Sequence, residues 1–263
     1  LVLAECRMLT QDHAAFDREV EGLAARLRDD EHRLQLAMLQ LVSLDARLME
    51  NEAIEVGRRA LRLVGIELPE TPEQQQEAVG AEFAEFQRLM AGRPAEVLLD
   101  LPPLRDRRLA AAMQILFRLA PDAHNTLQPA LFALMALRNA NLMLQHGGDT
   151  LAPGIIVTLA LTLRGMTGDS VTADAFARTA VALDAKLGHP LTASTTFVYT
   201  YFLRHWLHPL DGALQLNLDG IRAGFEMGDI QFGAYHAAAY VIHLLGSGGG
   251  LAEVARIGGE HLR

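Results

Sequence analysis

The stretch TGDSVTADAFARTAVALDAKLGHPLT, residues 167–192, holds one complete helix signal between two breaks in the chain. Its apolar side chains recur at spacings of three and four residues: Phe176, Ala180, Leu183 and Leu187. That period places them on one helix face, whereas Asp174, Arg178 and Lys186 fall off this apolar line. The stretch therefore predicts an amphipathic helix with a tight joint at each end.

The joint that opens this stretch is a Gly-Asp pair, which occurs in three separators: GGDT at 147–150, TGDS at 167–170 and MGDI at 227–230. The glycine suits the left-handed position that ends a helix. The aspartate suits the N-cap of the following helix, because its carboxylate accepts a backbone N–H. Each separator therefore predicts a turn between two helices.

Other breaks recur about every 20 residues along the whole chain. They lie at 10–12, 28–31, 49–52, 65–74, 91–94, 120–125, 188–192, 207–209 and 246–250. Each interval has the length of one helix, so a helix pair takes about 40 residues, within the range of helical solenoids. The alternating run TTFVYTYF at 195–202 is also interpreted as helix, because helical patterns flank it.

The composition favours helices packed on helices. Half of the 263 residues are hydrophobic but only 6% are aromatic, and alanine and leucine are strong helix formers. We predict an all-α fold of antiparallel helix pairs, about 11–13 helices, stacked as a right-handed, tetratricopeptide-like superhelix (an α-solenoid). Residues 1–263 are expected to form a single helical-repeat domain, with sub-boundaries at the proline-containing linkers 65–75 and 92–105.

Small residues mark places where two helices are expected to approach closely: Gly57, Ala60, Gly224, Gly233 and Ala237. Residues 52–64 show why, since Gly57 and Ala60 fall on the apolar face of that segment.

Charge, hydropathy and cysteine content limit the kinds of partner and the location expected for this chain. The formal charge is −9 and Lys186 is the only lysine, so without a basic stripe we expect no nucleic-acid partner. No apolar run reaches the roughly 20 residues of a membrane span, so no membrane partner is expected. The chain starts at Leu1 without a secretory signal and has a single cysteine, Cys6. We therefore expect a cytoplasmic location and a piece of a longer protein.

Signatures of catalysis and cofactor binding are missing from the sequence. Lys186 follows alanine and precedes leucine, so it does not belong to a phosphate-binding loop. EHRLQL at 31–36 departs from the kinase catalytic loop, and no serine stands in a Gly-x-Ser-x-Gly context. We predict no catalytic residues, no cofactor and no enzymatic activity of this chain.

The segment RHWLHPL, residues 204–210, raises the question of a metal site. His205 and His208 are three residues apart, and Asp211 could add a third ligand. Pro209 is expected to end one helix at 208 and to open the next, which would separate these three side chains. We therefore predict no metal, a histidine near the last helix carbonyls, and Trp206 as an anchor between helices.

A second set of aromatic and histidine side chains lies at Tyr235, His236, Tyr240 and His243. If this segment packs against 195–206, the two sets could line one groove for a peptide or small ligand. The residues of that candidate groove are Tyr199, Tyr201, His205, Trp206, Tyr235, Tyr240 and His243. Ordinary core and rim packing is the alternative.

Several segments together resemble a known family. NEAIEVGRRALRLVGIELPETPEQ, EVLLDLPPLRD, LMLQHGGDT and RHWLHPLDGALQLNLDGIRAGFEMGDIQFGAYHAAAYV follow one another in the chain. They are similar to the helical-repeat region of large bacterial multi-domain signalling proteins. Those proteins join a serine/threonine kinase-like domain, a STAND-type ATPase, helical repeats, a GAF sensor and a histidine kinase or cyclase output.

The resemblance implies a non-catalytic scaffold for protein interaction and signal relay, between the ATPase or kinase part and the sensor or output domains. Its partner would be a flanking domain or a peptide segment, and a homodimer is a further expectation. The alternative is a sensor domain that binds a small molecule or peptide at Tyr199, Trp206, Tyr240 and His243.

Overall fold

The computed structural model describes residues 1–189 and 191–261, and Pro190, inside the predicted break at 188–192, lies outside this part. The regular secondary structure of the described residues is helical and contains no strand, which confirms the all-α prediction. The α-helices are α1 (Val2–Leu9), α2 (His13–Arg26), α3 (Asp30–Asp45), α4 (Glu50–Arg62), α5 (Pro72–Met90), α6 (Arg107–Asn125), α7 (Pro129–His146), α8 (Ala152–Thr167), α9 (Ser170–Lys186), α10 (Thr192–Val198), α11 (Leu214–Met227), α12 (Ile230–Gly246) and α13 (Leu251–His261). Short helices are η1 (Ala95–Asp100), η2 (Tyr199–Leu203), η3 (Arg204–Trp206) and η4 (Asp211–Ala213).

The chain forms two compact units. The first comprises Leu1–Ala91 and Pro102–Gly147, and the second comprises Gly92–Leu101 and the described residues from Gly148 onward. The chain thus leaves the first unit at 92 and returns to it at 102, within the predicted linker 92–105. The other predicted sub-boundary, 65–75, lies inside the first unit.

Two of the three Gly-Asp separators form the predicted joint. Gly168 ends α8 with φ +73°, and the Asp169 carboxylate accepts backbone N–H groups of the first turn of α9. Gly228 and Asp229 repeat this arrangement between α11 and α12. The separator at 147–150 differs, because Asp149 accepts from the Leu151 N–H and the next helix begins only at Ala152.

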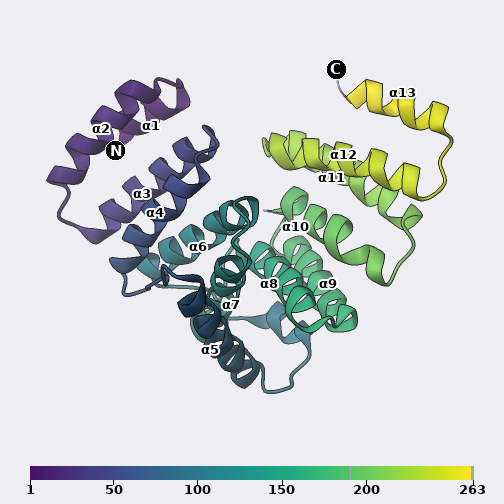
Figure 1. The fold of residues 1–263 in the computed structure, drawn as a ribbon, viewed down its shortest axis with the longest axis horizontal. Coiled ribbons are helices and arrows are strands. Elements are labelled where there is room, and N and C mark those ends of the chain that lie inside the picture. Colours follow the sequence, from purple (N-terminus) through teal and green to yellow (C-terminus); the bar gives the residue numbers. More distant parts are fainter. Residues whose placement is uncertain (190, 262–263) are drawn as a thin grey trace. The chain divides into compact units, whose positions relative to one another are not determined.

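The first unit is built on consecutive helices that pack in pairs, with α6 and α7 at its centre (Figure 1). The largest buried side chains of these two helices include Leu116, Leu119, Leu131 and Leu134. α4 packs on α6, where Gly57 faces Leu119 so closely that a Cβ would overlap its side chain. Gly57 therefore makes the close helix approach that the sequence predicted.

Helix α5 departs from simple pairing with its neighbours in the chain, because it packs against α7. Glu82 of α5 accepts from Arg138 Nε at 2.7 Å and from Asn141 Nδ2 at 2.7 Å. Gln145 of α7 donates to Glu85 of α5 at 2.9 Å. Polar bonds thus fix the position of α5 along α7.

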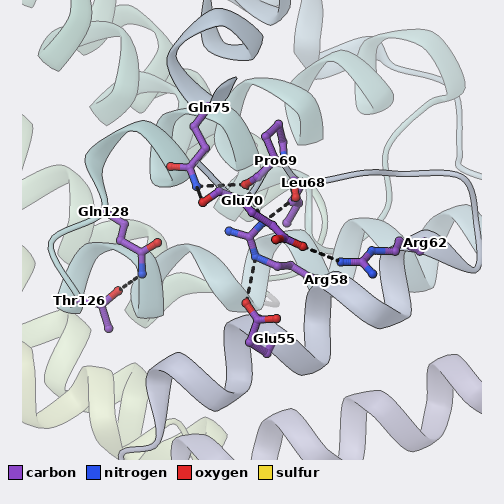
Figure 2. A network of polar contacts seen from close by, with 9 residues as sticks. All are labelled: Glu55, Arg58, Arg62, Leu68, Pro69, Glu70, Gln75, Thr126 and Gln128. Atoms are coloured by element: carbon purple, nitrogen blue, oxygen red, sulfur yellow. Dashed lines mark hydrogen bonds and ion pairs between the residues drawn. The ribbon is translucent and has the colours of Figure 1, made fainter. Parts of the chain in front are cut away.

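The segment before α5 is held by a buried arginine, as Figure 2 shows. Arg58 is only 3% exposed, and its guanidinium donates to the carbonyls of Leu68 and Pro69. Gln75 also donates to the Pro69 carbonyl, at 3.0 Å. The irregular segment is shorter than the predicted linker 65–75, because Thr71 caps α5 and its first turn begins at Pro72.

The second unit contains the helix pairs α8–α9 and α11–α12, with α10 packed against all four of these helices. Gly224 and Gly233 meet where α11 crosses α12, and a Cβ on Gly224 would lie 2.6 Å from the Gly233 Cα. η1 packs on α9, where Lys186 donates to the Leu99 carbonyl at 2.7 Å and pairs with Asp100 at 3.0 Å.

Two predicted breaks differ from the structure. α6 continues through the expected break at 120–125 and carries Pro121 inside it, since proline removes only one backbone donor when neighbouring turns hold the helix. Pro209 was expected to follow a helix ending at 208 and to open the next. Instead the helical segment ends at Trp206, and α11 begins at Leu214 after the short helix η4.

Across the described part of the chain, no helix has both the length and the apolar content needed to cross a membrane.

Candidate functional site

The candidate site lies in the second unit, where α10 continues as a π-helical turn, η2, and then as η3. α10 packs against α12, so the two predicted aromatic sets do come from neighbouring helices. A π-turn carries one extra residue per turn and often occurs at functional sites. We describe the side chains in three groups: an aromatic cluster, two buried polar clusters and an exposed edge.

Phe197 is the centre of the aromatic cluster. Its ring stacks on Tyr201 at a centroid distance of 5.3 Å and contacts Tyr235 at 5.3 Å and Phe232 at 5.8 Å. Tyr235 keeps 43% of its surface exposed. Offset and edge-on aromatic contacts of this kind stabilise a cluster beyond the area they bury.

The first buried polar cluster surrounds Asp174, which is 4% exposed. The Tyr199 hydroxyl donates to Asp174 at 3.0 Å, and Arg178 Nε donates to its second oxygen at 2.8 Å. His208 Nε2 lies 3.1 Å from Asp174 Oδ1. Burial, together with the Asp174 charge, raises the pKa of Tyr199 to about 12, so this hydroxyl keeps its proton at neutral pH.

This cluster corrects two expectations. Asp174 was placed off the buried face of its helix, but it is buried because three polar side chains satisfy it. His208 was expected to face the last carbonyls of a helix. It faces the Asp174 carboxylate from the segment after η3.

The second buried polar cluster joins Asn217 of α11 to His236 and His243 of α12. Asn217 lies 2.9 Å from His236 Nδ1 at one end of its carboxamide and 2.9 Å from His243 Nδ1 at the other. His236 Nε2 lies 2.9 Å from the Ala193 carbonyl. Burial lowers the pKa of both histidines, so the neutral ring is favoured in each. Gly220 leaves the space that the His236 ring fills.

The π-turn connects the two polar clusters through consecutive residues. Tyr199 donates to Asp174, whereas Thr200 lies 3.4 Å from the Asn217 carboxamide and is fully buried. Thr200 also donates to the Thr196 carbonyl at 2.9 Å. This one turn of backbone therefore positions Tyr199 against α9 and Thr200 against α11.

Trp206 lies at the exposed edge. It is 52% exposed, and the Arg164 guanidinium stacks over its ring at 4.0 Å. His205 is also exposed, with its ring centroid 5.1 Å from that of Trp206. The expectation that Trp206 anchors the core between helices is therefore wrong, since half of its surface is exposed and its ring contacts the guanidinium of the half-buried Arg164.

The structure brings together part of the predicted groove. Tyr201 lies 6.1 Å from His243 between ring centroids, and Tyr201 and Tyr235 contact the same phenylalanine. Tyr199 and Trp206 make their contacts elsewhere, with α9 and α8. Tyr240 is half-buried on α12.

Sequence reasoning did not select Asn217, Thr200 or Asp174, although the structure makes them the centres of the polar contacts. One signal was available for Asn217, because it shares a spacing of three and four with Gly220 and Gly224 on α11. A polar residue on such a small-residue face is expected to be buried and hydrogen-bonded.

Two hollows lie outside this site. An open groove of about 370 Å³ in the first unit is lined by Phe16, Asp17, Gln40, Leu44, Arg47, Asn51, Glu52, Glu55, Val56 and Arg59. In the second unit a hollow of about 340 Å³ lies between η1, the start of α8 and the end of α9. Within residues 1–189 and 191–261, no group of three or more His, Cys, Asp or Glu side chains is arranged to hold a metal ion.

Comparison with known proteins adds no relative: no family model, no curated protein and no solved structure matches this chain.

Proposed function

We propose that this chain is a non-catalytic helical-repeat module that binds a segment of another protein or of a flanking domain. In this proposal its helix pairs stack as a right-handed, tetratricopeptide-like superhelix. Short capped joints between consecutive helices support it, since repeats of this kind bury a continuous core by stacking on their neighbours.

The observation that carries the proposal is the open groove of the first unit. Phe16, Leu44 and Val56, from α2, α3 and α4, line it with the edges of buried apolar side chains. Gln40 and Asn51 add amide groups that can donate to and accept from a peptide backbone. The mixture of apolar, amide and charged side chains suits an extended polypeptide better than a compact apolar ligand.

The resemblance to the helical region of bacterial signalling proteins supports a relay role for this binding. A segment of a neighbouring ATPase, sensor or output domain would occupy the groove and exchange with competing partners. The coding sequence around this chain tests that part directly. A phosphate-loop ATPase on one side and a GAF domain on the other are the expected neighbours, and flanking domains of unrelated kinds would contradict the relay.

Binding itself is tested by selecting from a displayed random-peptide library on the purified chain. The double variant Asn51→Arg with Arg59→Glu should weaken selected peptides at least about tenfold, because both residues line the groove and are exposed. Arg62→Glu is the matched control for Arg59→Glu, since it makes the same charge reversal on the same helix but outside the groove. No enriched peptide, or peptides that bind the double variant equally well, would refute the proposal.

A second candidate function is a sensor for a small aromatic ligand at the aromatic cluster. The exposed ring of Tyr235 and its contact with Phe197 favour it, because aromatic faces stack on planar ligands. A ligand of the folded state raises the melting temperature. A thermal-shift screen should therefore give hits that Tyr235→Ala abolishes and Tyr240→Ala retains, and hits indifferent to Tyr235→Ala would exclude this cluster.

A further inference from the structure

Three buried polar side chains form a continuous row inside the second unit. His236 Nε2 faces the Ala193 carbonyl, His236 Nδ1 faces the Asn217 carboxamide, and the other end of that carboxamide faces His243 Nδ1. Each of these separations is 2.9 Å. His236 and Asn217 have no exposed surface and His243 has 4%. Buried polar groups of this kind are hydrogen-bonded, and the row supplies a partner for both nitrogens of His236 and for Nδ1 of His243.

The protons of the neutral row are fixed by the Ala193 carbonyl, which can only accept. His236 Nε2 must donate to it, so a neutral His236 leaves Nδ1 as an acceptor. The amide group of Asn217 must then point at His236 and its oxygen at His243, which reverses the orientation in the structure, where Oδ1 faces His236 and Nδ2 faces His243. His243 consequently carries its proton on Nδ1. Thr200, which donates to Thr196, can accept the second amide proton of Asn217.

The charged row has a different arrangement. An imidazolium donates from both nitrogens, so a protonated His236 needs the Asn217 oxygen, not its amide group. This is the orientation that the structure holds, with Oδ1 toward His236 and Nδ2 toward His243. His243 Nδ1 must then accept, and its proton must reside on Nε2.

We propose that this row is a proton-operated switch, in which uptake of one proton at His236 turns the Asn217 carboxamide over and moves the His243 proton from Nδ1 to Nε2. The carboxamide has nearly the same shape in both orientations, so the helices need not move. One event at a fully buried histidine thereby changes the second histidine from an acceptor to a donor at Nε2. No covalent bond between heavy atoms changes.

Few charged groups surround the row. α10 contributes no titratable side chain. η3 contributes Arg204 and His205; burial is the largest cause of the lowered pKa of His243, and the charges of His205 and Arg204 lower it further. Of η2, Tyr199 bonds to Asp174 and Tyr201 packs by its ring near His243. The other charged groups of the packed elements have solvent or partners of their own. Asp211 on η4, Glu226 on α11 and Glu253 on α13 are exposed. Asp219 pairs with Arg222, Asp229 caps α12, and Arg256 pairs with Glu260. The switch therefore responds mainly to protons and to the charges of η3.

The direction of the response follows from burial. Burial lowers the pKa of His236 below 6.5, so the neutral arrangement dominates at neutral pH and the charged one forms in acid. η3 carries the exposed His205 and Trp206. The charges of Arg204 and His205 on η3 act on His243, so a change in the state of His243 would be felt at this exposed edge. This switch lies in the second unit and does not depend on peptide binding by the first.

Nitrogen-15 NMR of the histidine rings in the intact chain tests the switch. At pH 8 we expect His236 with its proton on Nε2 and His243 with its proton on Nδ1. As the pH falls, His236 should become an imidazolium, and the His243 proton should appear on Nε2 with the same midpoint. A His243 proton that starts on Nε2, a His243 that does not respond, or unfolding at that midpoint would each overturn the proposal.

The variant Asn217→Asp separates the switch from simple titration. A carboxylate offers an oxygen to both histidines, so His236 should charge at a higher pH while His243 keeps its Nδ1 proton throughout. His32→Gln, at an exposed position of α3, is the control and should leave both profiles unchanged. A tautomer exchange at His243 that persists in Asn217→Asp would show that the carboxamide does not turn.

Discussion

At the scale of single residues, Asp122 shows how far burial changes a carboxyl group. It is 5% exposed on α6, and its Oδ2 has no hydrogen-bond partner. Burial, followed by the charges of Asp45 and Glu50, raises its pKa to about 7, against the lowering effect of Arg118. Burial also raises the pKa of Asp45, which pairs with Arg118 at 2.7 Å.

Asp122 should make the folded state less stable as the pH rises. The pKa of Asp122 in the folded state lies above the unfolded value of 3.8. The stability that the protonated carboxyl group gives the folded state is therefore fully present below pH 3.8 and is lost as the pH rises through about 7. Asp122→Asn should therefore stabilise the chain at pH 8.5, on the order of 2–4 kcal/mol, relative to its effect at pH 4. Urea unfolding at both pH values measures this difference.

Asp219→Asn is the control for that measurement, because Asp219 is exposed on α11. It should show no such pH dependence. An Asp122→Asn effect that is equal at both pH values would mean that the carboxyl is ionised throughout.

At the scale of elements, the effect of replacing a helix glycine depends on whether another helix lies against it. Gly224→Ala would place a Cβ against the backbone of Gly233, which cannot rotate away. We expect a loss of about 1–3 kcal/mol in the free energy of unfolding, because α11 and α12 must separate. Gly165→Ala, on α8 with nothing within 4 Å, should instead stabilise by about 0.5–1 kcal/mol. Thermal unfolding of both variants decides between these outcomes, and equal effects would contradict this account of the crossing.

The Arg58 contacts predict a second element-scale effect. Arg58→Lys retains the charge but cannot reproduce the bonds to the carbonyls of Leu68 and Pro69, and we expect a loss of about 2 kcal/mol. Arg62→Lys is the matched control, because Arg62 is the exposed last residue of the same helix and its contact with Glu70 is 3.4 Å long. Denaturant unfolding gives the two values, and limited proteolysis should cut the Arg58→Lys chain faster between α4 and α5. Identical behaviour of the two variants would show that the buried guanidinium does not hold this segment.

At the scale of the whole molecule, the second unit recruits a segment that is separated from it in sequence. η1 belongs to this unit although residues on both sides of 92–101 belong to the first. Leu98 of η1 is only 1% exposed, and Lys186 bonds to the backbone and side chain of the same segment.

A fragment that begins at Gly148 should therefore be less stable than one in which residues 92–101 are joined to it by a flexible linker. The expected difference is about 2–3 kcal/mol, mainly from burial of Leu98. Circular dichroism melting curves of the two fragments compare them. A linked Leu98→Ser version should behave like the shorter fragment, and equal stability of all three would contradict the assignment of η1 to this unit.

The helices themselves were accessible from the sequence, because their signals are local. Apolar period, capping aspartates and left-handed glycines act within a few residues, as the joint at Gly168 and Asp169 shows. The same reasoning failed at Pro121 and Trp206, where the outcome depends on neighbouring helices.

The polar clusters were decided only by the tertiary structure. Nothing near Asp174 in the sequence indicates that Tyr199 and His208 will satisfy it, and nothing near Asn217 indicates two histidines of another helix. The sequence alone thus determined a chain of capped amphipathic helices, since that depends on contacts within one or two turns. The packing of those helices decided which polar side chains are buried together, because burial, hydrogen bonding and pKa depend on groups distant in the chain.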